Sequence, residues 1–184
     1  MLLLPSGAKP NIFFAILAFG GSEVEIMYLD PSFPIYESVI RYSGAIPVPV
    51  SLHENLGFSF KAENILSQIT EQTRLIIINS PNNPTGGVIP KKEIDKLVCG
   101  LLEYPDVTIL SDEIYSQFIY EDKTHTSLLQ YPDLCDRVIV IDGWSTTYAM
   151  PGWRIGYAVW PENMAELITR FCINDHSCVN RANQ

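Results

Sequence analysis

A carboxylate follows an apolar run in the segment Ser-Asp-Glu-Ile-Tyr at residues 111–115. The run at 107–110, Val-Thr-Ile-Leu, is typical of a strand that is buried on both faces. Burying Asp112 at the end of such a strand is costly unless a positive group lies beside it. We therefore expect a cation at Asp112, supplied by the protein or by a ligand. The alternative is an ordinary aspartate that caps a short helix.

Three other loops carry polar groups. Ser-Gly-Ala-Lys at 6–9 opens a predicted helix, and a helix start with free N–H groups and a nearby glycine can bind an anion. A plain helix start is the alternative. Ser-Pro-Asn-Asn-Pro-Thr-Gly at 80–86 is a dense turn after a predicted strand. The loop at 143–154 is rich in aromatic and small residues and ends at Arg154. Taken singly, none of these loops establishes a ligand site.

The elements between these loops must bring them together. Short apolar runs alternate with segments of helical periodicity, which predicts an α/β fold: a mostly parallel sheet with helices on both faces. Ligands bind such sheets at the carboxyl ends of the strands. Pro47 and Pro49 indicate that their strand is at an edge or irregular. The expected strands are 24–28, 46–50, 75–79, 107–110, 138–141 and 155–159. The expected helices are 7–19, 36–42, 61–69, 91–102 and 162–172.

Composition limits the classes of partner. The 184 residues are 47% hydrophobic and 18% charged, which suits one globular domain. A formal net charge of −9 argues against nucleic acid, because phosphate backbones require clustered Lys and Arg. The apolar stretch 1–19 lacks a basic start and is too short to span a bilayer, so we expect no membrane segment and a cytoplasmic protein. Residues 1–4 resemble the end of an element whose earlier partners are absent, as in the middle of a longer chain.

Cysteine and histidine spacing indicates neither a disulfide framework nor a metal site. The cysteines form no Cys-x-x-Cys pair, so we expect reduced, buried or half-buried thiols, with two disulfides as the alternative. The histidines have no metal-ligand spacing, and we expect no metal and no role for them. The residues concerned are Cys99, Cys135, Cys172, Cys178, His53, His125 and His176.

Five motifs occur in one order: Gly-Ala-Lys, Pro-Ser-Phe-Pro-Ile-Tyr, Ser-Pro-Asn-Asn-Pro-Thr-Gly, Ser-Asp-Glu-Ile-Tyr and Gly-Trp-Arg-Ile-Gly-Tyr. In this order and spacing the chain resembles the class I/II aminotransferases of the fold-type I, aspartate aminotransferase-like family, which depend on pyridoxal 5'-phosphate (PLP). The resemblance covers nearly the whole chain and implies that residues 1–184 are a PLP-binding large domain. The family's N-terminal arm and C-terminal small domain have no counterpart here.

The resemblance implies where the cofactor phosphate would bind. The loop Gly7, Ala8 and Lys9 would offer backbone N–H groups, and Arg154 would be the bidentate cation. Ser145 is a weaker phosphate candidate by the same resemblance.

The resemblance also assigns the residues around the pyridine ring. Phe33 would stack on the ring, and Asn83 and Tyr115 would hydrogen-bond its 3-oxygen. Asp112 would pair with the protonated ring nitrogen, a charge-assisted contact worth roughly 1.5–3 kcal/mol. By this resemblance, the protonated ring nitrogen would be the cation that we expect beside Asp112.

One departure from the family concerns the reaction itself. The residues at 147–150, Thr-Tyr-Ala-Met, and at 152–154, Gly-Trp-Arg, keep the family spacing and put Thr146 where the family has its cofactor-binding lysine. Threonine can neither bond to the cofactor aldehyde nor act as the proton-transferring base. Loss of a general base typically costs roughly 10²–10⁴-fold in rate. We therefore expect PLP to bind non-covalently at most.

Three functions remain open at this stage. The first is an aminotransferase by descent, acting on an amino acid and a 2-oxo acid but impaired in this chain. The second is a non-catalytic module that binds PLP or its amine form, and the third is an α/β domain with a vacant pocket. The resemblance also implies a homodimer. Retention of Asp112, Tyr115, Asn83 and Arg154 favours an intact pocket over a decayed one.

Overall fold

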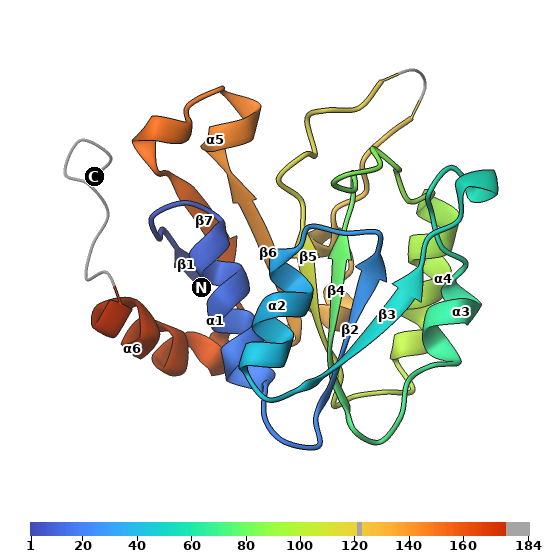
Figure 1. Cartoon of the computed structure of the whole chain (residues 1–184), viewed down its shortest axis with the longest axis horizontal. Helices are drawn as coiled ribbons and strands as arrows, with labels where there is room; N and C mark the ends of the chain where they lie inside the picture. Colours follow the sequence, from blue (N-terminus) through green and yellow to red (C-terminus); the bar gives the residue numbers. More distant parts are fainter. Residues whose placement is uncertain (121–122, 176–184) are drawn as a thin grey trace.

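The apolar runs form one seven-stranded sheet in the computed structural model, which describes residues 1–120 and 123–175. The strand order across the sheet is β1-β7-β6-β5-β4-β2-β3 (Figure 1). The predicted edge position of the proline-containing strand is confirmed, because β3 lies at one end of this order. The strands are β1 (Leu2–Leu3), β2 (Glu25–Asp30), β3 (Ile46–Ser51), β4 (Thr73–Asn79), β5 (Thr108–Asp112), β6 (Val138–Gly143) and β7 (Gly156–Val159).

The sheet is mostly parallel, as predicted. β2, β3, β4, β5 and β6 pair in parallel, whereas β7 pairs antiparallel with β6 and with β1. The pairing of Leu2 with Val159 and of Leu3 with Ala158 corrects the expectation for residues 1–4, whose partner is a later strand. A two-residue strand carries too little periodicity to reveal its partner in the sequence.

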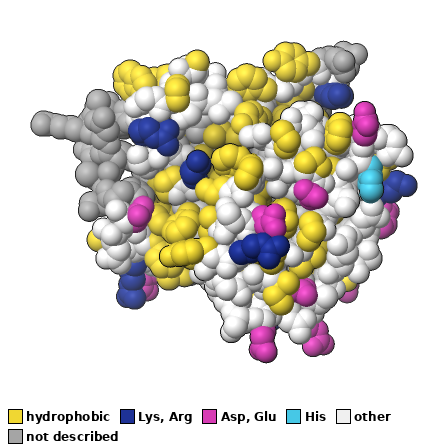
Figure 2. Space-filling view, in the orientation of Figure 1, with side chains coloured by type: hydrophobic (Ala, Val, Ile, Leu, Met, Phe, Trp, Pro, Cys, Tyr) yellow, Lys and Arg dark blue, Asp and Glu magenta, His cyan; other side chains and the backbone are white. Residues whose placement is uncertain are grey.

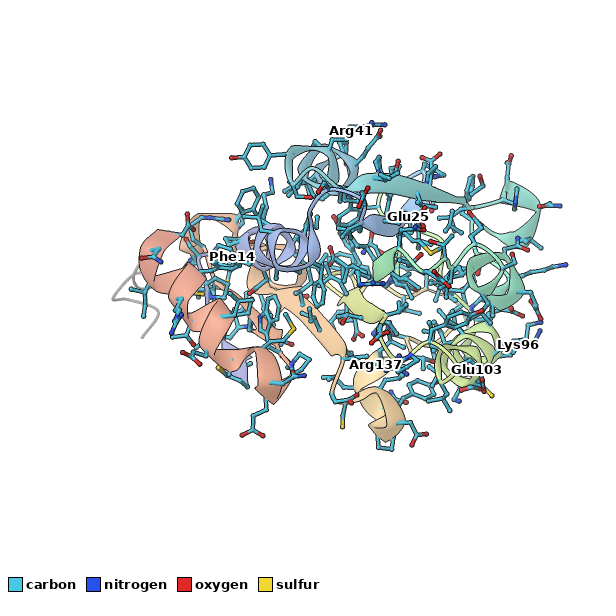
Figure 3. The ribbon with its side chains drawn as sticks, turned by 90° about the horizontal axis from the view of Figure 1, so that it is seen from below. Phe14, Glu25, Arg41, Lys96, Glu103 and Arg137 are labelled. Carbon is cyan, nitrogen blue, oxygen red and sulfur yellow. The ribbon has the colours of Figure 1, made fainter. Side chains whose placement is uncertain are left out.

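Helices cover both faces of the sheet, as predicted (Figure 1). One core cluster joins the sheet to α1, α2 and α6, and the other joins it to α3 and α4. Figure 3 shows Phe14 on the α1 side and Lys96 on the α4 side. The helices are α1 (Lys9–Phe19), α2 (Ile35–Tyr42), α3 (Ala62–Leu66), α4 (Lys91–Leu101), α5 (Trp144–Thr147) and α6 (Ala165–Asp175).

The central strand β4 shows why its sequence is continuously apolar. Leu75 and Ile77 belong to the core cluster under α1 and α2, and Ile76 and Ile78 belong to the cluster under α3 and α4. Each of the four side chains is at most 2% exposed. Successive side chains point to opposite faces, so a strand covered by helices on both sides needs apolar residues at every position.

Some predicted details are wrong. The helix expected at 61–69 is only Ala62–Leu66, and the helix expected at 162–172 starts as the 3-10 turn Glu162–Met164 before α6. The thiols of Cys99, Cys135 and Cys172 are free, as expected, but Cys99 and Cys135 are exposed. The expectations for Cys178 and His176 lie outside the described residues.

Candidate functional site

A cavity of about 240 Å³ lies at the carboxyl end of the parallel strands. Residues from the ends of β4 and β5, the first turn of α1, the start of α2 and the loop after β6 contribute to its wall. The structure brings all the predicted site residues to this wall except Gly7 and Thr146. The lining residues are Ala8, Lys9, Ile12, Phe33, Tyr36, Asn79, Asn83, Asp112, Ile114, Tyr115, Ser145 and Arg154.

Gly7 lies against the guanidinium of Arg154, although the two are separated by most of the chain. A Cβ at Gly7 would come within 2.6 Å of Arg154 Nη2, and Gly7 has a φ of +94°. The Arg154 Nη2 also donates to the Ser6 carbonyl at 3.3 Å, and Nη1 donates to the Pro151 carbonyl at 3.0 Å. Glycine is therefore required here both for its backbone conformation and for the approach of the arginine.

The start of α1 is seated on glycines of two strands. A Cβ at Gly156 of β7 would lie 2.3 Å from the Ala8 nitrogen, and one at Gly143 of β6 would lie 3.4 Å from the Ala8 Cβ. The N–H groups of Ala8 and Lys9 belong to the helix start, where no preceding carbonyl of the helix is available to them. Together with Arg154 they form a positively polarised corner suited to an anion.

Asp112 is the buried carboxylate of the cavity, at 4% exposure. Its Oδ2 accepts a hydrogen bond of 2.6 Å from the Tyr36 hydroxyl, and its Oδ1 accepts one of 3.3 Å from the Ile114 N–H. Burial raises the pKa of Asp112 to about 6, although both hydrogen bonds lower it. Among the described residues no Lys, Arg or His forms an ion pair with it. The protein cation considered for this site is therefore not observed among these residues, and the bond from the Ile114 N–H leaves the capping alternative open beside a ligand cation.

Tyr36 and Asn79 are site residues that the sequence did not single out. Tyr36, 1% exposed on α2, is a hydroxyl donor to Asp112, and burial together with the nearby carboxylate raises its pKa well above the usual value. The Asn79 side chain donates to the Asp112 carbonyl at 3.0 Å and accepts from the Asn83 N–H at 2.8 Å. The sequence could have indicated Asn79, because it is a polar residue at the last position of a buried strand.

Asn83 and Tyr115 converge on the same side of the cavity from separate loops. The Asn83 side-chain amide donates to the Tyr115 hydroxyl at 3.2 Å. Both groups keep hydrogen-bonding capacity beyond this contact, since an amide has two donors and a hydroxyl accepts as well as donates. The pair can therefore bind an oxygen of a ligand.

Lys9 and Phe33 form the opposite part of the wall. The Lys9 Nζ lies 5.3 Å from the centroid of the Phe33 ring, within the range of a cation–π contact. The cavity thus has cations at Lys9 and Arg154 and an anion at Asp112. A ligand with an anionic group at one end and a cationic ring would complement this separation of charge.

A family model, aminotransferase class I and II, matches residues 1–177. The chain belongs to this family. An aspartate aminotransferase of Sulfolobus acidocaldarius is 35% identical over 179 residues, and an aromatic-amino-acid aminotransferase of Thermococcus litoralis is 32% identical over 177. Each match covers 96% of this chain but only 44% and 45% of the relative, respectively.

Solved structures of family members show the same fold. An aspartate aminotransferase from Rhizobium meliloti matches with a TM-score of 0.92 at 29% identity, and an aromatic aminotransferase from Pyrococcus horikoshii with 0.91 at 31%. Both matches cover 97% of this chain, and 45% and 47% of the solved chains. The chain thus spans under half the length of the family members it matches.

Thr146, which the resemblance puts at the position of the family's lysine, lies on the short helix α5. Its neighbour Ser145 lines the cavity, whereas Thr146 does not. Arg154, eight positions further on, has a φ of +54° at the end of the 3-10 turn Pro151–Trp153. The loop at 143–154 therefore brings Ser145 and Arg154 to the cavity, whereas Thr146, directly after Ser145, does not line it.

Two further findings concern the described residues. No group of three or more His, Cys, Asp or Glu side chains in this part of the chain could hold a metal ion. None of its helices is long and apolar enough to cross a membrane.

Proposed function

We propose that this chain is the cofactor-binding portion of a PLP-dependent aminotransferase, and that it binds PLP without a covalent bond. The observation that carries this proposal is that one cavity is lined by the cations Lys9 and Arg154 and by the buried carboxylate of Asp112. The Arg154 guanidinium packs on the helix start at Gly7, and the buried Asp112 carboxylate has no described cation as its partner.

The donor set of the cavity fits PLP. Ala8, Lys9 and Arg154 can hold a phosphate, which is matched best by backbone N–H groups and a guanidinium. Asp112 accepts the protonated ring nitrogen, and the Asn83–Tyr115 pair meets the ring's 3-oxygen. The Phe33 ring can stack on the pyridine, and Ser145 adds a hydroxyl near the phosphate. Each role in holding the phosphate and the ring thus has a candidate group at the cavity, whereas the role of the lysine has none.

The cofactor, when bound, supplies an electron sink for reactions at the Cα of an amino acid. The protein's residues hold it in the state that serves this purpose. Asp112 keeps a positive charge at the ring nitrogen, and Tyr36 holds the carboxylate in place by donating to Oδ2. Tyr115 and Asn83 restrain the opposite edge of the ring.

Thr146 limits what the chain can do with this cavity. A hydroxyl of ordinary acidity cannot take and return a proton as the family's lysine does, and it cannot anchor an aldehyde. We propose that transamination between an amino acid and a 2-oxo acid is impaired for this reason. Thr146 also favours the second candidate function, a non-catalytic module that binds PLP or pyridoxamine 5'-phosphate (PMP). A homodimer and a cytoplasmic location, both expected from the sequence, remain part of the proposal.

Equilibrium binding of PMP tests the proposed site, because PMP has no aldehyde and cannot react with surface lysines. We expect Asp112→Asn and Arg154→Gln each to weaken binding about tenfold or more, since each removes a charge-assisted contact. Arg41→Gln is the matched control, because Arg41 pairs with Glu37 on the exposed side of α2. Equal affinities for all four proteins would place the ligand elsewhere, and no binding at all would favour the vacant-pocket alternative.

A further inference from the structure

Glu113 is a second buried carboxylate, next in sequence to Asp112 but on the other face of the sheet. It is 6% exposed. Its Oε1 accepts hydrogen bonds from Ser111 Oγ at 2.9 Å and from the Leu128 N–H at 3.1 Å, and its Oε2 lies 2.9 Å from His125 Nε2. None of these partners lines the cavity. A buried carboxylate with several donors is held in one orientation.

The main chain of Glu113 marks the point where β5 leaves the sheet. Its N–H donates to the Ile141 carbonyl of β6 at 2.9 Å, and its carbonyl accepts from the Ser116 N–H at 2.8 Å. The second bond closes the turn that carries Tyr115. Glu113 therefore joins the strand end that bears Asp112 to the turn that bears Tyr115.

His125 approaches Glu113 from the segment that returns toward the core. Its side chain is 15% exposed, and its Nδ1 is buried with no hydrogen-bond partner among the described residues. Among the residues that the structure describes, the Glu113 carboxylate is the hydrogen-bond partner of the imidazole. Three residues later, Leu128 donates its N–H to the same carboxylate and packs into the core beneath α4. This contact was not predicted from the sequence.

We propose that Glu113 and His125 are positioning residues for the cofactor cavity, which rests on the proposed function. Asp112 precedes Glu113 directly and Tyr115 follows it by two positions, both line the cavity, and the bond from the Ser116 N–H to the Glu113 carbonyl closes the turn that carries Tyr115. A carboxylate can accept from all three donors at once. A glutamine at this position can keep its oxygen for Ser111 and Leu128, but it faces His125 Nε2 with an amide NH₂, so the imidazole has to change tautomer and the charged acceptor that holds the turn is lost.

The test compares PMP affinity and melting temperature in the full chain for Glu113→Gln, His125→Ala and Glu93→Gln. Glu93 is the matched control: it is 7% exposed, accepts from the Ala62 N–H at 2.9 Å, and lies 3.5 Å from Lys96 of the same helix, α4. We expect the Glu113 and His125 variants to bind PMP about tenfold more weakly. Glu93→Gln should lower the melting temperature to a similar extent without weakening binding.

A double-mutant cycle with Tyr115→Phe separates positioning from general loss of structure. Because Glu113 acts partly through Tyr115, Glu113→Gln should cost less affinity in the Tyr115→Phe background than in the wild type. Strictly additive losses, or PMP affinity retained in both Glu113→Gln and His125→Ala, would overturn the positioning role while leaving the proposed function intact. A wild-type chain that binds no PMP would overturn both.

Discussion

At the scale of single residues, Asp112 and Gly7 hold the two ends of the candidate site. Asp112 is an acid kept in an apolar setting with a tyrosine hydroxyl as its donor. Gly7 is a glycine whose missing side chain leaves room for a guanidinium. Each residue lowers the stability of the ligand-free protein, and a bound ligand would offset that loss. Each effect on stability can be measured.

Asp112→Asn should stabilise the ligand-free protein at high pH. Burial raises the pKa of Asp112 from 3.8 to about 6, so the folded state holds the proton more tightly than the unfolded state. The stability contributed by this group is complete below pH 3.8 and is lost as the pH rises through 6. Above that pH the variant should gain on the order of 2–3 kcal/mol in free energy of unfolding.

Urea unfolding at pH 4.5 and pH 8 measures this difference. The matched control is Asp95→Asn, because the hydrogen bond from Lys91 lowers the pKa of Asp95 on the exposed side of α4. The Asp95→Asn variant should show no gain in free energy of unfolding at pH 8. An Asp112→Asn protein no more stable than the wild type at pH 8 would show that the cavity does not disfavour the carboxylate.

Gly7→Ala should weaken PMP binding as well as stability. Its Cβ would have to displace Arg154 Nη2 from a distance of 2.6 Å, which moves the phosphate-binding cation. Gly57→Ala is the control, because Gly57 also has a positive φ, +66°, but has open space where its Cβ would lie. Both variants should lose about 1 kcal/mol through backbone strain. Only Gly7→Ala should lose affinity, and equal affinities in a titration would remove Arg154 from the phosphate site.

At the scale of elements, the sequence was most informative where burial on both faces dictates the pattern. The apolar run at 107–110 predicts a strand buried on both faces, and the parallel arrangement then brings the loops at 80–86 and 111–115 to one edge of the sheet. The bond from Tyr36 to Asp112 could not be predicted, because it joins residues 76 positions apart through a hydroxyl on a helix. The antiparallel pairing of β1 was equally hidden, because it involves only two residues.

The two faces of the sheet should respond differently to cavity-creating substitutions. Leu97→Ala in α4 and Ile40→Ala in α2 each remove a side chain that is 0% exposed, and each should lower the free energy of unfolding by about 2–5 kcal/mol. Ile40 packs in the cluster that contains Tyr36, whereas Leu97 packs on the opposite face. Only Ile40→Ala should also weaken PMP binding by the folded protein. The reverse result would mean that the α4 face supports the cavity.

At the scale of the whole molecule, large hydrophobic side chains gather along the upper edge of the face shown in Figure 2. Figure 1 places α5 and the segment after β5 at this edge. The exposed side chains there belong to Phe118, Tyr120, Trp144, Tyr148 and Trp153. Exposed apolar surface of this kind is typical of an interface. It agrees with the proposed homodimer.

Tyr148→Lys should weaken self-association. Tyr148 is 62% exposed beside Trp144, and a lysine there would place a charge in the apolar surface. Tyr42→Lys is the control, because Tyr42 is 75% exposed at the end of α2. Sedimentation over a range of concentrations should show a dimer that only Tyr148→Lys dissociates. A stable, monodisperse wild-type monomer at high concentration would contradict the proposed dimer.

Reduction of the PLP complex with borohydride, followed by peptide mass spectrometry, tests the central claim most directly. The wild-type chain should carry no cofactor on the peptide that contains Thr146, because threonine offers no amine to the aldehyde. Thr146→Lys should become labelled at residue 146, because its neighbour Ser145 and Arg154, at the end of the same loop, both line the cavity. A wild-type label on Lys9 would contradict non-covalent binding, and a Thr146→Lys protein that takes no label would contradict the site itself.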